Sequence, residues 1–244
     1  MANQFGLIGY PLGHSFSKKY FSNKFKKSKS LDSYELFELT NINELTKLLK
    51  STQLKGLNVT IPYKQQVIPF LHTLDRSAQL VGAVNVIKIL DNQLVGYNTD
   101  YPAFRATLKN WLDHTNIKAL VLGTGGASKA VIAALNDLKI QHQQVSRTKA
   151  SNFISYEELA TNSKWIQEFE LIINTTPLGM APNINNQPAI PYAQLTSNHY
   201  LYDLVYNPLE TSFLLSGRKS KCKTKNGIEM LELQAELAWD IWNA

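Results

Sequence analysis

A glycine-rich segment in the middle of the chain limits its possible folds more than any other feature. The apolar run 118–122 leads directly into Gly123-Thr124-Gly125-Gly126-Ala127-Ser128, and a helical pattern continues to residue 138. Gly123 permits a tight turn, Gly125 allows close approach to the backbone, and the small Ser128 lets the helix pack on the strand. Strand, turn and helix in this order predict a βα unit of a parallel sheet.

Short apolar segments alternate with helical patterns along the rest of the chain, which predicts an α/β fold with parallel sheets. We expect strands over residues 5–9, 33–39, 56–60, 83–89, 93–97, 118–122, 171–174 and 200–203, and a further strand that ends near residue 145. We expect helices over residues 42–49 and 226–242, one helix that begins near residue 17, one that begins near residue 102, and one that ends at residue 138. We divide these elements into two domains, residues 1–100 and 101–225. The final helix, 226–244, can pack on either domain.

Composition narrows the class of protein. The chain has 244 residues, 44% of them hydrophobic and 18% charged, as in ordinary globular proteins. Its apolar runs are too short to cross a bilayer, and residues 1–5 lack the pattern of a signal peptide. Cys222 is the single cysteine, so no internal disulfide or cysteine-based metal cage can form. We therefore expect a cytoplasmic protein with no bound metal.

The net charge of +6 favours anionic partners. Two basic stretches, 24–29 and 218–225, are compatible with nucleic-acid or phosphate binding. They are equally typical of a solvated helix end and a lysine-guarded edge strand. Neither stretch contains interleaved aromatic residues or a nucleic-acid motif, so we favour the second interpretation and expect no nucleic-acid or membrane partner.

The glycine-rich turn has the features of a dinucleotide site. A helix that begins there directs free amide hydrogens and a positive dipole end towards phosphates. The following strand ends in Ser146-Arg147-Thr148, with no acid to bind a ribose 2′-hydroxyl, and Arg147 lies 24 residues after Gly123. An arginine can bind a 2′-phosphate bidentately, so the pattern predicts NADP. The alternatives are a non-binding glycine turn and a surface arginine.

Polar residues also follow the strands of the first half. Asn58 and Thr60 share one strand face, and Lys64 follows Pro62. Without further signals Lys64 is a solvated lysine, and Asp100 could simply cap the helix that begins near residue 102.

Other candidates have similar alternatives. Ser15 and Ser17 can cap a helix or bind a carboxylate. Gln234 lies on the same helical face as Met230, so it either satisfies a neighbouring backbone group or binds a ligand.

Together these segments resemble the shikimate dehydrogenase family along essentially the whole chain. The resemblance rests on Gly9-Tyr10-Pro11-Leu12-Gly13-His14-Ser15-Phe16-Ser17, Asn58-Val59-Thr60 with Pro62 and Lys64, Gly82-Ala83-Val84-Asn85, Asn98-Thr99-Asp100, Gly123 to Ser128, Asn174 to Met180, Asp203 to Pro208, and Gly227 with Met230, Leu231 and Gln234.

The resemblance implies reversible, NADPH-dependent reduction of 3-dehydroshikimate to shikimate in the chorismate pathway to aromatic amino acids. Lys64 and Asp100 would be the catalytic pair. The implied substrate ligands are Ser15, Ser17, Asn58, Thr60, Asn85, Tyr206 and Gln234. The implied cofactor site comprises Gly123, Thr124, Gly125, Gly126, Ala127, Ser128, Ser146, Arg147, Thr148, Thr175, Pro177, Gly179, Met180, Leu204 and Gly227.

The resemblance also implies an architecture: an N-terminal α/β substrate domain, a Rossmann-like NADP-binding domain, a cleft between them, and a last helix that packs back on the substrate domain. The sequence departs from the family at Lys18, Phe21-Ser22, Ala103 and Ser146. Two alternative functions remain, a quinate/shikimate dehydrogenase of broader specificity and an inactive NADP-binding sensor. The chain could be a monomer or a homodimer.

Overall fold

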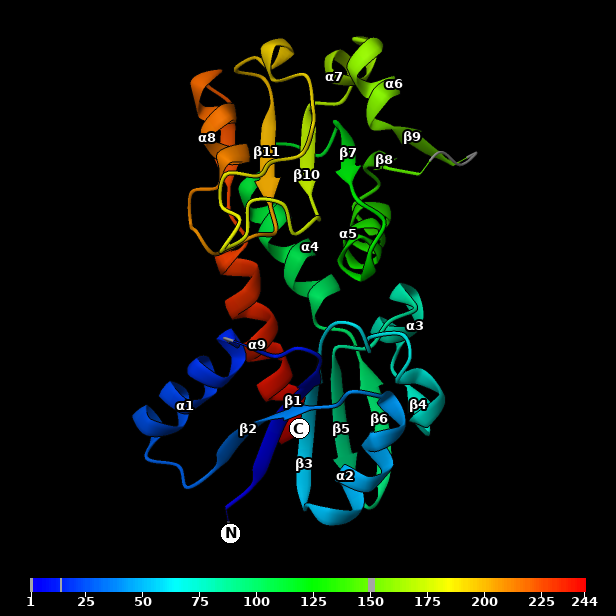
Figure 1. The fold of residues 1–244 in the computed structure, drawn as a ribbon, viewed down its shortest axis with the longest axis vertical. Helices are drawn as coiled ribbons and strands as arrows, with labels where there is room; N and C mark the ends of the chain where they lie inside the picture. The colour runs from blue at the N-terminus through cyan, green and yellow to red at the C-terminus, as the bar shows by residue number, and fades with distance from the viewer. Residues whose placement is uncertain (1, 14, 149–151) are drawn as a thin grey trace. The chain divides into compact units, whose positions relative to one another are not determined.

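Two six-stranded sheets organise the residues that the computed structural model describes, which are 2–13, 15–148 and 152–244 (Figure 1). The chain divides into unit 1, Met1–Pro102 with Gln234–Ala244, and unit 2, Ala103–Leu233. The divisions fall inside helix α4 (Asp100–Trp111) and inside helix α9 (Ile228–Asn243). From the sequence we expected the domain boundaries between residues 100 and 101 and between residues 225 and 226.

The sheet of unit 1 is mixed. Its spatial order is β2 (Ser33–Glu38), β1 (Gln4–Gly9), β3 (Leu54–Val59), β5 (Val86–Leu90), β6 (Gln93–Tyr97) and β4 (Thr73–Leu74). β1 is parallel to β2 and β3, whereas β5 is antiparallel to both β3 and β6. The expectation of parallel sheets is therefore wrong here. Asp91 and Asn92, with φ of 48° and 62°, form a tight hairpin turn that reverses the chain.

Both faces of this sheet are buried. The helices of unit 1, besides α9, are α1 (Phe16–Ser28), α2 (Leu45–Ser51) and α3 (Arg76–Val81), with short 3₁₀ turns at Ile42–Glu44 and Ile68–Phe70. One core cluster includes Phe5, Phe21 and Trp242, and the other includes Ile8 and Leu57. Successive residues of β1 thus point to opposite faces, as strand geometry requires.

The end of α9 is fixed against this sheet by Trp242. Its side chain is fully buried and its Nε1 donates to the Ile87 carbonyl at 3.0 Å. A Cβ on Gly56 would lie 2.2 Å from the indole nitrogen, so the absence of a side chain at Gly56 makes this contact possible. The final helix therefore packs on unit 1 from Gln234 onwards.

The sheet of unit 2 is entirely parallel. Its order is β12 (Lys223–Lys225), β11 (Tyr200–Asp203), β10 (Leu171–Asn174), β7 (Lys118–Leu122), β8 (Gln141–Ser146) and β9 (Phe153–Ser155). This is the Rossmann order, in which the direction of strand addition reverses between β7 and β10. Ligands bind such sheets at the carboxyl ends of the two strands that flank the reversal.

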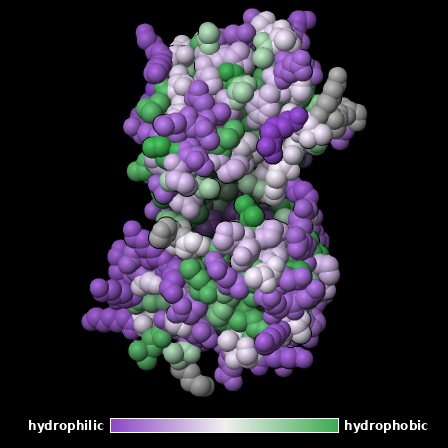
Figure 2. All heavy atoms as spheres, viewed as in Figure 1, coloured by the Kyte–Doolittle hydropathy of each residue, from purple (hydrophilic) through white to green (hydrophobic). Residues whose placement is uncertain are grey.

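The second basic stretch, 218–225, covers the end of one helix and the edge strand β12 of unit 2. Helices α5 (Gly126–Asp137), α6 (Tyr156–Thr161), α7 (Lys164–Glu168) and α8 (Ser212–Lys219) accompany the strands, with a 3₁₀ turn at Tyr192–Gln194. β12 is an edge strand, and two of its three residues are lysines. Hydrophilic side chains cover much of the face of each unit drawn in Figure 2. Among the described residues, no helix is long and apolar enough to span a membrane.

Candidate active site

Lys64 and Asp100 form a partly buried ion pair in unit 1. Lys64 lies in the turn that follows β3, where its carbonyl accepts from the Val84 amide at 2.7 Å. Its Nζ is 2.6 Å from Asp100 Oδ2, and the two side chains are 21% and 13% exposed. Such a pair is not a solvated surface contact, because most of each side chain is removed from water.

Asp100 is also not the cap of α4. It is the first residue of that helix, and the Tyr101 amide donates to Asn98 Oδ1 at 3.1 Å. Asn98, and not Asp100, therefore accepts from an amide at the start of α4. The Asp100 carboxylate is left for other partners.

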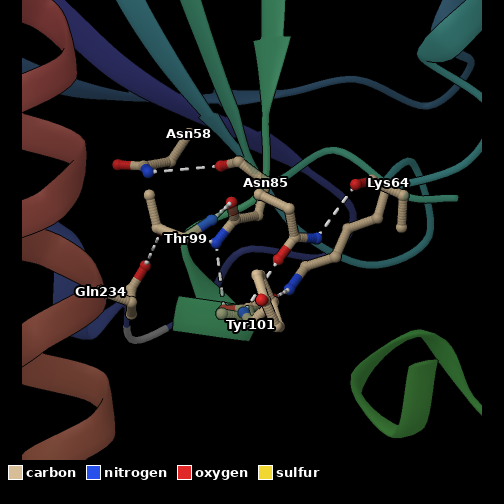
Figure 3. A network of polar contacts seen from close by, with 9 residues as sticks. Asn58, Lys64, Asn85, Thr99, Tyr101 and Gln234 are labelled. Carbon is tan, nitrogen blue, oxygen red and sulfur yellow. Dashed lines mark hydrogen bonds and ion pairs between the residues drawn. The ribbon is translucent and has the colours of Figure 1, made fainter. Parts of the chain in front are cut away.

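Asn85 holds the second oxygen of that carboxylate. Its Nδ2 donates to Asp100 Oδ1 at 3.0 Å and to Thr99 Oγ1 at 2.9 Å, and its Oδ1 accepts from the Thr99 amide at 2.7 Å (Figure 3). Both Asp100 oxygens are thus fixed, one by Lys64 and one by Asn85. An ammonium carries three hydrogens, so Lys64 can donate to a ligand while it remains paired with Asp100.

Two further amides join this network. Gln234 reaches from α9 towards Thr99, whose Oγ1 lies 3.5 Å from Gln234 Oε1 (Figure 3). Asn58, at the end of β3, donates from Nδ2 to the Asn85 carbonyl at 3.3 Å. Gln234 is 8% exposed and Asn58 5% exposed. The structure therefore brings Asn58, Asn85, Asp100 and Gln234 into one polar cluster with Lys64.

The two serines lie at the start of α1. Ser15 is the N-cap, and its side chain accepts from the Lys18 amide at 3.4 Å, so the capping interpretation of Ser15 is confirmed. Ser17 lies in the first turn. Lys18 forms an ion pair with Glu35, in which Nζ lies 2.7 Å from Oε2. Thr60 is half-buried directly after β3, while His14 lies outside the described residues.

The glycine-rich turn of unit 2 has the predicted form. Gly123 has a φ of +110°, and a Cβ there would lie 2.9 Å from Thr175 Oγ1, so both conformation and space require glycine. Ser128 is 1% exposed and its hydroxyl donates to the Gly125 carbonyl at 2.7 Å. The small residue thus packs beneath the turn, as the sequence predicted.

The N-terminus of α5 is open. Gly125 is its N-cap and makes no side-chain cap bond. A Cβ built on Gly125 or Gly126 meets no atom of the described residues within 4 Å. Thr124 is exposed and Ala127 half-buried in the same turn. This surface presents amide hydrogens to open space, which is the arrangement that binds an anion.

The segment after β8 contains the predicted phosphate-binding arginine. Ser146 is buried, and its Oγ accepts from the Thr148 amide at 3.1 Å. Arg147 and Thr148 are exposed. Ser146 therefore stabilises the turn, whereas the Arg147 guanidinium is accessible to a ligand.

A buried carboxylate, Asp203, joins the loops that follow β10 and β11. It accepts from Asn174 Nδ2 at 2.9 Å, from the Val205 amide at 3.0 Å and from Thr211 Oγ1 at 2.6 Å. The residue is fully buried, and desolvation raises its pKa to about 6, although hydrogen bonds from Thr211, Val205 and Asn174 act in the opposite direction. Asp203 thus determines how the two loops sit on the sheet.

The other predicted cofactor residues lie on these loops, except Gly227, which lies between β12 and α9. Thr175 Oγ1 donates to the Leu122 carbonyl at 2.7 Å, at the strand reversal. A Cβ on Gly227 would lie 2.2 Å from the Leu204 carbonyl oxygen, so these two segments are in close contact. The loop after β10 contains Thr175, Pro177, Gly179 and Met180, and the segment after β11 contains Leu204 and Tyr206. Burial raises the pKa of the Tyr206 phenol.

Several residues of the site were not predicted from the sequence. Thr99 links Asn85 to Gln234, and Asn98 accepts from the Tyr101 amide at the start of α4. Both lie beside Asp100 between a strand and a helix, a position where polar side chains can be expected to serve the site. Tyr34, whose hydroxyl donates to Asn58 Oδ1, and Asp203, which accepts from Asn174, gave no comparable signal, because these partners lie 24 and 29 residues away in the sequence.

Comparison with known proteins identifies the relatives of this chain. Residues 7–87 match the family described as shikimate dehydrogenase substrate binding domain. A shikimate dehydrogenase (NADP(+)) of Clostridium beijerinckii is 40% identical over 98% of this chain and 91% of its own length.

Solved structures similar to this chain include a shikimate dehydrogenase and a quinate dehydrogenase. The shikimate 5-dehydrogenase of Thermus thermophilus in complex with NADP(H) and shikimate is 29% identical, with a TM-score of 0.86 over 98% of this chain and 93% of that one. A quinate dehydrogenase of Corynebacterium glutamicum in complex with NAD is 25% identical, with a TM-score of 0.86 over 99% and 93%.

Proposed function

Because the chain belongs to the shikimate dehydrogenase family, we propose that it catalyses the reversible NADPH-dependent reduction of 3-dehydroshikimate to shikimate. The observation that carries this proposal is the Lys64–Asp100 pair, held at 2.6 Å within the polar cluster of unit 1. A ketone reductase needs a proton donor beside groups that orient hydroxyls, and this cluster supplies both.

Lys64 is the residue that acts on the carbonyl oxygen. Its ammonium donates a hydrogen bond to the ketone, stabilises the negative charge that develops there, and delivers the proton as the alcohol forms. In the oxidative direction the same amine takes up the hydroxyl proton. Asp100 and Asn85 hold the ammonium and the carboxylate in a fixed relation during these steps.

The remaining polar residues bind and orient the substrate. Ser15 and Ser17, at the start of α1, bind the carboxylate with help from the helix dipole. Ring hydroxyls are bound by Asn58, Thr60, Asn85 and Gln234, together with Tyr206 of unit 2. Asp100 accepts a hydrogen bond from a ring hydroxyl as well as from Lys64.

The residues of unit 2 fit NADP. The open, uncapped N-terminus of α5 suits a pyrophosphate, and the exposed Arg147 suits a 2′-phosphate. When bound, NADPH supplies the hydride to the carbonyl carbon. We assign its site to Gly123, Thr124, Gly125, Gly126, Ala127, Ser128, Ser146, Arg147, Thr148, Thr175, Pro177, Gly179, Met180, Leu204 and Gly227. Residues 1–100 with the end of the last helix then form the substrate domain and residues 101–225 the cofactor domain.

A second candidate function is a quinate/shikimate dehydrogenase of broader specificity. The likeness to the quinate dehydrogenase of Corynebacterium glutamicum supports this alternative, although the sequence identity of 25% is lower than that to the shikimate dehydrogenase of Clostridium beijerinckii. An inactive NADP-binding sensor is disfavoured because Lys64 and Asp100 retain the geometry of a working pair.

One assay distinguishes these functions. Cofactor oxidation is followed at 340 nm with 3-dehydroshikimate and with 3-dehydroquinate, each with NADPH and with NADH. We expect turnover with 3-dehydroshikimate and NADPH to dominate. Comparable rates with both substrates would indicate the broader enzyme, and binding of NADPH without turnover would indicate the sensor. Light scattering on the same sample decides between a monomer and a homodimer.

A further inference from the structure

Tyr34 is a buried tyrosine whose hydroxyl points into the polar cluster of unit 1. It lies on β2, is 2% exposed, and stacks on Phe21 with ring centroids 4.7 Å apart and planes 15° apart. Its hydroxyl donates to Asn58 Oδ1 at 2.7 Å. Burial raises the pKa of the Tyr34 phenol far above its ordinary value, so the phenol keeps its proton and remains a donor.

The sheet register explains how residues on different strands meet. Tyr34 pairs with Phe5, and Asn58 with Leu7, on opposite sides of β1. Phe5 and Leu7 are two residues apart and therefore point to the same face. The long tyrosine side chain reaches across β1 on this face, where Phe21 covers its ring. Phenylalanine at position 21 is one of the departures from the family pattern.

The contacts of Asn58 determine which atom of its side-chain amide accepts and which donates. Oδ1 accepts from Tyr34 at 2.7 Å, and Nδ2 donates to the Asn85 carbonyl at 3.3 Å. Rotating the amide by half a turn would place Oδ1 against another carbonyl oxygen. An amide nitrogen carries two hydrogens, so in the observed orientation Nδ2 has a second hydrogen to donate. Ser17 acts on the same phenol in the direction opposite to burial and lowers its pKa.

We propose that Tyr34 is a positioning residue of the substrate site, whose hydroxyl fixes the Asn58 amide as a donor. This inference rests on the proposed function, which assigns Asn58 to the substrate. Tyr34 acts through Asn58 and does not itself need to touch the substrate.

The test is Tyr34→Phe in the full chain, which removes the hydroxyl and keeps the stacked ring. Loss of one buried hydrogen bond that orders a ligand group predicts a KM for shikimate raised about five- to tenfold. The KM for NADP should stay within about twofold of wild type. The matched control is Tyr202→Phe in unit 2, another buried tyrosine, whose hydroxyl lies 2.8 Å from Thr107 Oγ1. It should leave the KM for shikimate unchanged.

A double-mutant cycle with Asn58→Ala separates positioning from a general loss of stability. If Tyr34 acts through Asn58, Tyr34→Phe should change the KM for shikimate by less than about twofold in the Asn58→Ala background. A full effect in that background overturns the inference, as does an unchanged KM in the single variant.

The side-chain amide signal of Asn58 in ¹⁵N-labelled protein without ligand gives a readout independent of activity. We expect this signal to move or broaden in Tyr34→Phe and to stay in place in Tyr202→Phe. A wild-type chain without turnover would refute the proposed function, and the amide signal would then decide the inference alone. An unmoved Asn58 signal in Tyr34→Phe overturns it.

Discussion

The buried Asp203 should make the stability of this protein depend on pH in an unusual direction. Its pKa is raised from 3.8 to about 6 because the carboxylate is desolvated. Below pH 3.8 the residue is protonated in both the folded and the unfolded chain, and above pH 6 it is ionised in both. Between these limits the folded chain binds more protons, so the free energy of unfolding falls as the pH rises.

The structure sets the magnitude. The gap between 3.8 and about 6 corresponds to about 3 kcal/mol over the full range. About 2 to 3 kcal/mol of this falls between pH 4 and pH 7. Because Asp203 is fully buried, solvent screening does not reduce this value. Asp203→Asn keeps the size of the side chain and removes the ionisation.

Urea denaturation of wild type and Asp203→Asn at pH 4, 5, 6 and 7 measures the effect. The free energy of unfolding of the variant minus that of wild type should rise by about 2 to 3 kcal/mol across this range. Thr211→Val removes a hydrogen bond that lowers the pKa of Asp203, so in that variant the decline should extend to higher pH. A difference between Asp203→Asn and wild type that stays constant with pH would refute the reasoning.

Three further substitutions test separate parts of the structure. Arg147→Ala should raise the KM for NADP by about ten- to a hundredfold and leave that for NAD unchanged; an unchanged NADP/NAD preference would show that another group binds the 2′-phosphate. In Gly227→Ala the new Cβ would lie 2.2 Å from the Leu204 carbonyl oxygen, so we expect a loss of about 1–3 kcal/mol in urea denaturation and a raised KM for NADP. Gly56→Ala should lower the free energy of unfolding by a similar amount, because the new Cβ would clash with Trp242. It should also raise the KM for shikimate, since α9 contains both Trp242 and Gln234. Wild-type stability in either glycine variant would contradict these close contacts.

Features that depend on local backbone geometry could be predicted from the sequence. The glycine-rich turn and the start of α5 could be predicted because the required residues are contiguous and follow a buried strand. The antiparallel pairing in the sheet of unit 1 was not predicted. Asp91 and Asn92, which adopt positive φ, are nevertheless residues typical of a hairpin turn. Apolar strands in parallel and antiparallel arrangements have similar patterns when both faces are buried.

Contacts between distant residues set the limit of prediction at the site. Asp100 could equally have been a helix cap, and its contacts with Lys64 and Asn85 in the folded chain show that its carboxylate has another role. Tyr34 reaches Asn58 across β1, and Asp203 joins three separate segments. The sequence contains these residues but does not specify their partners, because tertiary packing brings them together.

The most direct test of the account is the turnover of Lys64→Ala. We expect kcat for 3-dehydroshikimate reduction to fall by about 10²- to 10⁴-fold, with the circular dichroism spectrum and the affinity for NADPH unchanged. Lys118→Ala, which removes a more exposed lysine paired with Glu168 at 3.0 Å, is the matched control and should retain wild-type turnover. Wild-type turnover in Lys64→Ala would contradict the central claim that the Lys64–Asp100 pair carries the chemistry.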